Sequence, residues 1–489
     1  MSRHRPAALA TAIALIVAAC GGSAAGDNPS EAAASEEAAT TTTAGSPPDA
    51  GDDDETVPFL SLELEGKIEA FLDAPNSVLA TNVATEMALD GDRRWGPWLL
   101  DLLRMGDSTA LDDQVAGALE RISGVENPGF LTASYRTYGQ WVTDEDIDPG
   151  PGYREWKMTL LGQISDEFPI LLEGVTDDRE LSLVQWGGVL RGGIPELNDQ
   201  ERVPASEADW MTPDEIVFAV EIDDIAVAYP FRILGHHELA NDTIGDTPVS
   251  LVFCTLCRTA LLFDRRVEGQ VLDFQTSGLL TNSNKIMVDN QTDSLWSHLL
   301  AKGISGTHKD VVLEQFPVEA TTWADWVERH PDGETLTIPA PIFFPGQPER
   351  PPIAYEYDPE SAYEFYYNDP DVWFPILDTP SESFPLKTQV LGIEIGGAEL
   401  ALSVEALADE GTRVFLAGET PVLVVPTRVG ARVYVGTGLA DGDRPEVTDE
   451  NAEGATLTDG SVLPRLVVDQ GFWFAWFNNH PDTDWWPTS

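Results

Sequence analysis

The fold is decided by the stretch IVFAVEIDDIAVAY, residues 216–229. Apolar and β-branched residues fill both halves of this stretch, and the pair Asp223 and Asp224 separates them. This pattern predicts two strands joined by a tight turn. Residues 248–253 and 259–263 have the same character and predict two more strands. The sequence therefore predicts a β-rich body that begins near residue 206.

The hairpin pattern returns in the second half of the chain. Residues 217–234 align without a gap with residues 390–407, and Glu221 with Glu394 and Ala228 with Ala401 are among the identical pairs. A Trp-x-x-Trp-x-x-x-His-Pro-Asp motif also occurs twice, at residues 323–332 and 473–482. Self-similarity of this kind indicates a duplicated structural unit. We expect two β-rich units, at residues 206–338 and 390–489, linked by a Pro- and Tyr-rich connection at residues 339–389.

Residues 58–205 have a different periodicity. Trp95, Trp98, Leu99, Leu102 and Leu103 recur at the spacing of one face of a helix, and strand-like alternation is scarce. We expect this region to be α-helical. The predicted fold class is therefore α+β, with an N-terminal α-helical region followed by a β-rich, internally duplicated domain.

The first 57 residues predict export and anchoring. Arg3 and Arg5 precede a short apolar run at residues 7–19, which ends in the sequence VAAC at residues 17–20. This is the layout of a secretory signal peptide, and the last four residues resemble a bacterial lipobox, so Cys20 is the predicted lipidation site. Residues 21–57 are acidic and poor in apolar residues, which predicts a disordered tether. The predicted location is the extracytoplasmic face of a membrane, with the lipid bilayer as a partner through Cys20.

The composition excludes one class of partner. Asp and Glu number 83 against 28 Lys and Arg, so the formal net charge is -55. Phosphate recognition depends on clustered cationic side chains, so we expect no nucleic-acid binding. Hydrophobic residues make up 42% of the chain, which is enough for folded domains.

Cys254 and Cys257 are the only cysteines other than Cys20, and they form a C-x-x-C motif. This spacing permits a reversible disulfide with a perturbed thiolate, and it also permits two thiolates to bind one metal ion from a tight turn. Strands are predicted on both sides, so the pair is expected in a turn. The following Arg258 would favour a thiolate in either case.

Further polar residues are expected near the C-x-x-C motif. His237 is the candidate proton carrier or third metal ligand, and Glu238 or Asp242 would orient its ring. A Cys2His site would suit zinc or monovalent copper. His236 is a weaker alternative to His237. Four supporting residues besides Arg258 complete the candidate set: Asn241, Ser277, Asn282 and Ser283.

Several ordered motifs carry a resemblance to a known family. They are WGGV (186–189), GIP (193–195), AYP (228–230), HE (237–238), ND (241–242), CTLC (254–257), SGLL (277–280), TDSLW (292–296), FWFAW (472–476) and HPDT (480–483). In these motifs the chain resembles an exported prokaryotic family catalogued as a domain of unknown function, family 3179. Some members of that family resemble selenoproteins with selenocysteine at the C-x-x-C position, which implies redox chemistry. The family usually has Pro and Gly where Thr255 and Arg258 stand here, and an aromatic residue in place of His236.

Three hypotheses about function follow. The first is a thiol-disulfide oxidoreductase in which Cys254 and Cys257 cycle between dithiol and disulfide, with a redox partner that the sequence does not identify. The second is a soft-metal protein that binds zinc or copper through Cys254, Cys257 and His237 for transfer or sensing. The third is a non-enzymatic interaction protein in which the two cysteines form a structural disulfide.

Overall fold

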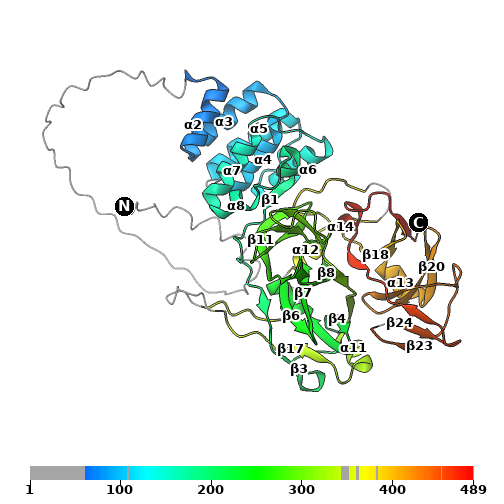
Figure 1. Ribbon diagram of the computed structural model, residues 1–489. Helices are drawn as coiled ribbons and strands as arrows, with labels where there is room; N and C mark the ends of the chain where they lie inside the picture. Colours follow the sequence, from blue (N-terminus) through cyan, green and yellow to red (C-terminus); the bar gives the residue numbers. More distant parts are fainter. Residues whose placement is uncertain are drawn as a thin grey trace, which may run out of the picture.

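The computed structural model describes residues 61–106, 109–342, 352–359, 363–380, 384–452 and 454–487. The predicted signal peptide, the tether and Cys20 lie outside these residues. In the described part, helices come first along the chain and strands follow, and the helices lie at one end of the β-rich body (Figure 1).

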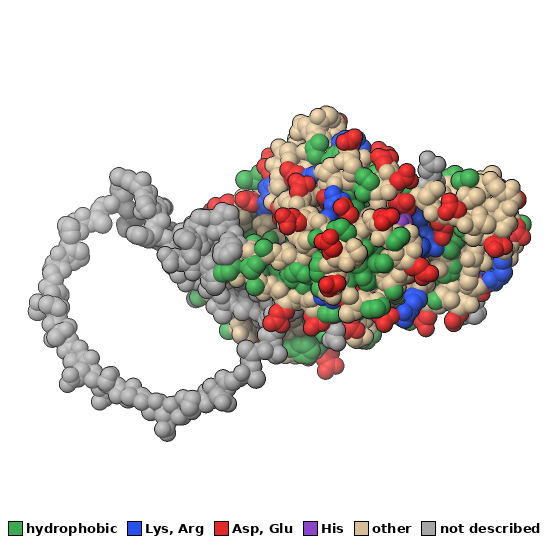
Figure 2. Space-filling view, turned by 90° about the horizontal axis from the view of Figure 1, so that it is seen from below, with side chains coloured by type: hydrophobic (Ala, Val, Ile, Leu, Met, Phe, Trp, Pro, Cys, Tyr) green, Lys and Arg blue, Asp and Glu red, His purple; other side chains and the backbone are tan. Residues whose placement is uncertain are grey.

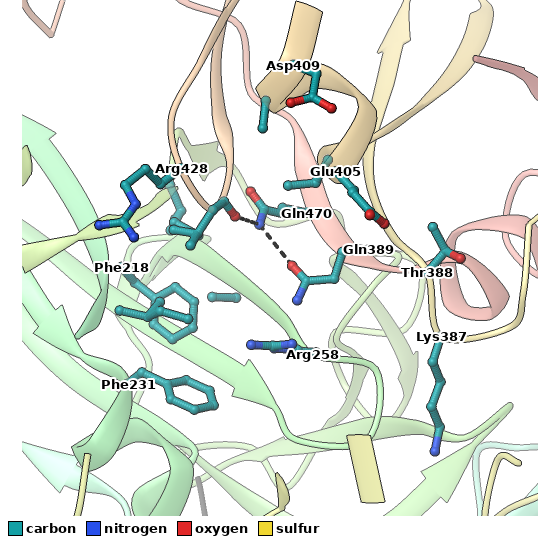
Figure 3. A pocket seen from close by; sticks show the side chains of 17 residues that line it. Phe218, Phe231, Arg258, Lys387, Thr388, Gln389, Glu405, Asp409, Arg428 and Gln470 are labelled. Carbon is teal, nitrogen blue, oxygen red and sulfur yellow. Dashed lines mark hydrogen bonds between the residues drawn. The ribbon is translucent and has the colours of Figure 1, made fainter. Parts of the chain in front are cut away.

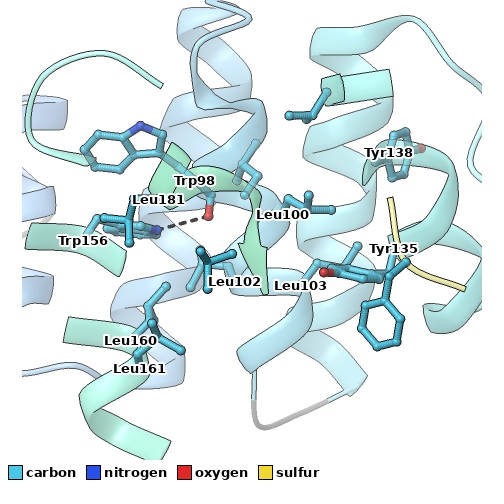
Figure 4. Packing of buried hydrophobic residues seen from close by; sticks show 14 of the residues in the cluster. Trp98, Leu100, Leu102, Leu103, Tyr135, Tyr138, Trp156, Leu160, Leu161 and Leu181 are labelled. Carbon is cyan, nitrogen blue, oxygen red and sulfur yellow. Dashed lines mark hydrogen bonds between the residues drawn. The ribbon is translucent and has the colours of Figure 1, made fainter. Parts of the chain in front are cut away.

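The helical part packs around large apolar side chains. Its helices are α2 (Leu64–Asp73), α3 (Ser77–Asp90), α4 (Trp95–Met105), α5 (Thr109–Ser123), α6 (Leu131–Asp144), α7 (Tyr153–Ile164), α8 (Glu167–Leu171) and α9 (Asp178–Leu183). Trp98 of α4 and Trp156 of α7 lie with ring centroids 5.2 Å apart, and the indole N–H of Trp156 donates to the Trp98 carbonyl at 3.1 Å (Figure 4). The apolar face of α4 thus forms the centre of this part, as its spacing predicts. No helix in the described ranges is both long and apolar enough to cross a membrane.

The first half of the β-rich body contains three larger sheets. The first has the order β16 (Glu319–Thr322), β4 (Ile216–Ile222), β5 (Ile225–Pro230), β17 (Glu334–Leu336), β3 (Arg202–Pro204). The second has the order β15 (Gln315–Phe316), β8 (Thr259–Asp264), β7 (Thr247–Cys254), β6 (Leu239–Ile244), β2 (Leu197–Asn198). The third has the order β1 (Val184–Trp186), β11 (Phe274–Thr281), β12 (Asn284–Asp289), β13 (Leu295–Ser297), β14 (Lys302–Ser305). A small ribbon, β9 (Arg266–Val267) and β10 (Gln270–Val271), and the helices η2 (Ala205–Glu207), α10 (Phe231–His237) and α11 (Trp323–Arg329) accompany them.

The second half supplies three further sheets. The fourth has the order β26 (Asp469–Phe472), β18 (Gln389–Ile395), β19 (Ala398–Ser403), β27 (Asp484–Trp486). The fifth contains β20 (Arg413–Ala417), β21 (Thr420–Pro426) and β22 (Ala431–Val435), and the sixth contains β23 (Val447–Glu450), β24 (Gly454–Leu457) and β25 (Val462–Pro464). The helices α12 (Glu364–Tyr367), α13 (Val404–Glu410) and α14 (Trp473–Phe477) complete this half.

Neighbouring sheets pack face to face. Side chains alternate along a strand, so the two faces of β7 meet different partners. Leu251 belongs to a hydrophobic cluster that includes Val220 of the first sheet, and Val252 belongs to one that includes Met287 of the third. In the second half, Leu391 of the fourth sheet and Val422 of the fifth belong to one hydrophobic cluster. Each sheet is therefore one blade in a series.

The series closes into a six-bladed β-propeller. A guanidinium nitrogen of Arg432 in the fifth sheet donates to Glu319 of the first sheet at 2.8 Å. The N–H of Phe472 in the fourth sheet donates to the carbonyl of Cys257, next to the second sheet, at 2.8 Å. The expected α+β class is therefore wrong for the β-rich part, because each half supplies three blades to one ring.

The expected repeat does fit the topology of two blades. β18 and β19 form a hairpin as β4 and β5 do, and β27 runs parallel to β19 as β17 runs parallel to β5. The Trp-x-x-Trp motifs begin α11 and α14 in corresponding positions. The duplicated unit thus includes a strand that joins its blade from far along the chain.

Acidic side chains are spread over the surface. Figure 2 shows many Asp and Glu side chains and few Lys and Arg side chains on one face of the described part. The net charge of -55 is consistent with this distribution. Such a surface repels polyanions and favours solubility.

Candidate functional site

The C-x-x-C motif forms the hairpin turn between β7 and β8. β7 ends at Cys254 and β8 begins at Thr259, and these two residues are paired across the hairpin. Arg258 completes the turn with a φ of 55°, in the left-handed region that few non-glycine residues adopt. Both thiols are free and buried, with 1% exposure for Cys254 and none for Cys257. The expected position of the pair in a turn between strands is thus what the structure shows.

A third donor group meets the cysteines, and it belongs to His298. One ring nitrogen of His298 and the two sulfur atoms lie within 4.8 Å of one another. His298 follows β13 of the third blade, whereas the cysteines belong to the second blade. The cluster therefore bridges two blades, and the residues between Cys257 and His298 include the whole β11–β12 hairpin.

The hydrogen bonds of His298 fix which nitrogen carries the proton. Its Nε2 lies 3.1 Å from the carbonyl oxygen of Val252, which can only accept, so Nε2 is the donor. Nδ1 therefore has a lone pair, and it lies 3.3 Å from the side-chain amide group of Asn284. The same amide group lies 3.1 Å from Sγ of Cys257. Burial, with a contribution from nearby Lys285, lowers the pKa of His298 to about 3, so the imidazole is neutral at physiological pH.

A buried ion pair lies beside the cysteines. Lys285 of β12 pairs with Glu238, and the hydroxyl of Thr255 donates to the other carboxylate oxygen at 2.8 Å. Thr255 lies between the two cysteines in the chain, so its hydrogen bond to Glu238 and the ion pair with Lys285 hold the turn in place. The ion pair also brings a positive charge close to Cys254.

The two thiols have opposite electrostatic environments. Burial alone would raise the pKa of Cys254, but the hydrogen bond from Cys257 and the charge of Lys285 outweigh it, so the pKa is lowered. Burial raises the pKa of Cys257 well above its usual range, and the neighbouring Cys254 adds to this effect. Cys254 is therefore the favoured thiolate, and Cys257 is the thiol that donates to it.

The second half of the chain holds the turn in place. Besides the Phe472 N–H bond to the Cys257 carbonyl, Gly471 lies so close that a Cβ there would be 1.9 Å from Oγ1 of Thr259. The hydroxyl of Tyr366 donates to the carbonyl of Leu256 at 3.0 Å. The half without cysteines thus supplies part of the enclosure of the site.

His237 lies in a different environment from the cysteines. Its Nδ1 donates to the carbonyl of Pro195 at 2.7 Å, and its Nε2 lies 2.7 Å from the hydroxyl of Tyr357. Both ring nitrogens are therefore engaged, and the Cys-Cys-His cluster found among the described residues contains His298 and not His237. His236 stacks on Tyr355, with ring centroids 4.8 Å apart. Burial lowers the pKa of His237 to about 4.

Of the remaining predicted residues, Glu238 belongs to the site, and Asp242 and Asn241 make hydrogen bonds within or between the blades. Glu238 belongs to the site through Lys285, whereas Asp242 accepts from the hydroxyl of Tyr229 at 2.7 Å and from its neighbour's N–H. Asn241 joins the second and third blades through two bonds with the backbone of Phe274, at 2.9 and 3.1 Å.

Three more of the predicted residues lie on the β11–β12 hairpin. Ser277 donates to the carbonyl of Ile286 at 2.5 Å. Asn282 and Ser283 form the turn, each with a φ of 54°. Their positions fit supporting roles in the framework.

Sequence reasoning missed His298, Lys285 and Asn284. The residues TDSLWSH at 292–298 place His298 two positions after a motif tryptophan, and Lys285 is the one cation in the run NKIMVD at 284–289. A lysine buried in a strand requires a paired charge, so Lys285 in this run indicates a buried ion pair. Pairing it with Glu238 requires knowledge of which strands are neighbours.

Comparison with known proteins yields one match. A family model described as Protein of unknown function (DUF3179) matches residues 191–483, which is more than half of the chain. No curated protein and no solved structure matches the chain.

Proposed function

We propose that this chain, which belongs to the DUF3179 family, binds a soft metal ion, monovalent copper or zinc, through Cys254, Cys257 and His298. The observation that carries the proposal is the convergence of three donor atoms within 4.8 Å in a buried cluster. Thiolate and imidazole donors suit both ions. His237, the third ligand expected from the sequence, is replaced in this proposal by His298.

The protonation states support a metal ligand set. A ligating imidazole must be neutral and its other nitrogen is usually held by a hydrogen bond, as the Nε2 bond to Val252 does here. A ligating thiol must lose its proton, and Lys285 favours the thiolate of Cys254. The ion would take the place of the Asn284 amide group at Nδ1 and draw the proton from Cys257.

The test is metal stoichiometry in protein purified under reducing conditions without chelator. We expect about one copper or zinc ion per chain after reconstitution with each ion separately, and competition between them identifies the preferred one. Cys254→Ser, Cys257→Ser and His298→Ala should each lose the ion, whereas His237→Gln, the matched control, should keep it. Failure of both ions to bind tightly, or equal loss in His237→Gln and His298→Ala, contradicts the proposal.

A second candidate function rests on the unequal thiols. A lowered pKa at Cys254 and a raised pKa at Cys257 are the environments of an attacking and a resolving cysteine. In this reaction the Cys254 thiolate attacks a disulfide of a partner, and one partner sulfur leaves as a thiolate. Cys257 then loses its proton and attacks Cys254, which releases the second partner thiol and leaves a Cys254–Cys257 disulfide.

Burial of both sulfur atoms ranks this function second, because exchange requires access to sulfur. The reduction potential of the Cys254–Cys257 pair tests the redox function. A Cys254–Cys257 disulfide that forms reversibly in glutathione buffers, together with turnover of a model disulfide that Cys254→Ser abolishes, supports the redox function. A pair that stays reduced in oxidising buffer excludes it.

We also propose that Cys20 is lipidated and holds the protein on the extracytoplasmic face of a membrane. The basic start, the apolar run and the VAAC sequence support this location. Cys20→Ser should move the protein from the membrane fraction to the soluble fraction or leave it uncleaved. Unchanged membrane association of that variant after the signal peptide has been removed contradicts lipid anchoring.

A further inference from the structure

A second site candidate is the cavity of about 610 Å³ between the two halves of the propeller. Figure 3 shows Phe218, Phe231 and Arg258 of the first half on one side, and Gln389 and Gln470 of the second half facing them. The volume lies in the range of small-molecule pockets. The metal cluster is not part of its lining, so a ligand bound here goes beyond the function proposed above, although Arg258 directly follows Cys257 in the chain.

Arg258 is the cation of this cavity that forms no ion pair among the described residues. In the described part of the chain, no carboxylate lies within 4.0 Å of its guanidinium nitrogens. Its polar partner is the neutral amide of Gln389, whose oxygen, when turned toward the guanidinium, accepts from Nη1 at 2.5 Å and from Nε at 3.2 Å. The guanidinium also lies 4.9 Å from the ring centroid of Tyr367. Arginine stays protonated in proteins, so its charge is balanced here by dipoles, aromatic faces and the charge of Glu364, which makes no ion pair with it.

The other two cations of the lining are engaged elsewhere. Arg428 pairs with Asp214 at 2.6 Å, outside the cavity lining. The ammonium group of Lys387 donates to the carbonyls of Tyr366 and Asp369, at 2.5 and 2.8 Å. Of the three lining cations, Arg258 is thus the one whose charge is available to a ligand.

The remaining lining defines the body and the charge of that ligand. Phe218 and Phe231 give the wall next to Arg258 an apolar, aromatic surface (Figure 3). Glu405 and Asp409 of α13 are exposed carboxylates on the opposite side. They would repel a ligand with several negative charges, so one anionic group on an apolar body fits best.

We propose that the cavity binds a small organic monocarboxylate with an aromatic or branched apolar body. Its carboxylate accepts two parallel hydrogen bonds from the guanidinium of Arg258, the geometry that arginine favours with this group. Its apolar body packs against Phe218 and Phe231. The carboxylate supplies the ion-pair partner that the partly buried guanidinium lacks.

Isothermal titration with 3-phenylpropionate tests the proposal on the full chain. We expect saturable binding, with 3-phenylpropanol, the neutral analogue of the same shape, at least about tenfold weaker. This comparison needs no variant and so does not depend on whether a variant folds. Equal affinity for the alcohol and the acid, or no binding of the acid up to about 10 mM, overturns the proposal.

Two variants then identify the residue responsible. Arg258→Gln should weaken 3-phenylpropionate binding at least about tenfold and reduce the preference for the acid over the alcohol. Arg428→Gln is the matched control, since it removes a cation from the same lining but one already paired with Asp214, and it should bind within about twofold of the wild type. Unchanged binding in a folded Arg258→Gln protein, or equal loss in both variants, overturns the assignment to Arg258.

Discussion

Lys285 and Glu238 form an ion pair beside the Cys254 turn, with side-chain exposures of only 5% and 6%. Both charges have been removed from water, so each depends on the other for compensation. The pair also sets the chemistry of the site, because Lys285 lowers and Glu238 raises the pKa of Cys254. Of these two opposed effects, that of Lys285 is the larger.

The first prediction concerns this pair. Lys285→Met should raise the pKa of Cys254, since it removes the favourable charge and leaves Glu238 beside the thiolate. It should also lower the free energy of unfolding by about 3 to 5 kcal/mol, the usual cost of an unpaired buried charge. The ultraviolet absorbance of the thiolate, followed against pH in metal-free protein, measures the first effect, and urea unfolding measures the second.

The double variant Lys285→Met with Glu238→Gln is the control for this prediction. It should recover part of the lost stability, because no buried charge is left unpaired. Its Cys254 pKa should still lie above that of the wild type, because the larger of the two charge effects is gone. A thiolate titration identical to that of the wild type would show that the pair does not act on Cys254.

Metal binding should release protons. Cys257 is protonated near neutral pH because its pKa is raised, whereas His298 is already neutral because its pKa is lowered to about 3. We expect between about one and two protons released per ion, from the thiols alone. Calorimetry in buffers with different ionisation enthalpies counts them. Binding without proton release contradicts the assignment of Cys257 as a ligand.

His237 should make stability depend on pH. Its pKa falls from 6.5 to about 4 in the folded protein, mainly through burial. Below pH 6.5 the unfolded chain takes up a proton that the folded chain excludes, so the free energy of unfolding should decrease as the pH falls from 6.5 to about 4. The contribution is about 1.4 kcal/mol per pH unit, or about 3 kcal/mol over the window.

Urea unfolding of metal-free protein across this window measures the effect. Other titrating groups contribute equally to the wild type and to His237→Gln, so the difference between their slopes isolates His237. The variant should show the shallower slope. Coincident slopes mean that the ring of His237 is not excluded from protonation in the folded protein.

Gly471→Ala should disturb the cysteine turn from the opposite half of the ring. The new Cβ would lie 1.9 Å from Oγ1 of Thr259 and 3.1 Å from the Cys257 carbonyl, so β26 must shift away from the turn. We expect a loss of about 1 to 3 kcal/mol in the free energy of unfolding, together with weaker metal binding. Chemical unfolding and metal titration of the same preparation check both results.

Gly235→Ala is the matched glycine control. It lies in α10, and a Cβ there would meet no atom within 4 Å. Because alanine favours a helix over glycine, this variant should be neutral or more stable by up to about 1 kcal/mol. Similar destabilisation by both substitutions would mean that the contact between Gly471 and the cysteine turn has no special role.

The strands and the cysteine turn could be predicted from the sequence because both depend on local patterns. Alternation around Asp223 and Asp224 predicts the β4–β5 hairpin, and apolar runs on both sides predict the turn of Cys254 and Cys257. The propeller was not predicted, because a blade also takes strands from distant parts of the chain. β16 joins β4, and β17 joins β5 in parallel, and no local pattern specifies those pairings.

The third member of the cluster was missed for the same reason. His237 is closer to the cysteines in the chain and precedes a predicted strand, so the sequence favours it as the third ligand. The structure instead ends α10 there and directs the ring to Pro195 and Tyr357. His298 reaches the sulfur atoms because the third blade packs on the second, which is a consequence of ring geometry.

The hydrogen bond from the Phe472 N–H to the Cys257 carbonyl also bears on when the cysteine turn is covered during folding. The cysteine turn and β26 lie far apart in the chain, so this bond forms only when β26 docks against the turn during folding. At the metal site proposed above, the ion would enter most easily before this docking, and the folded ring would then retain it.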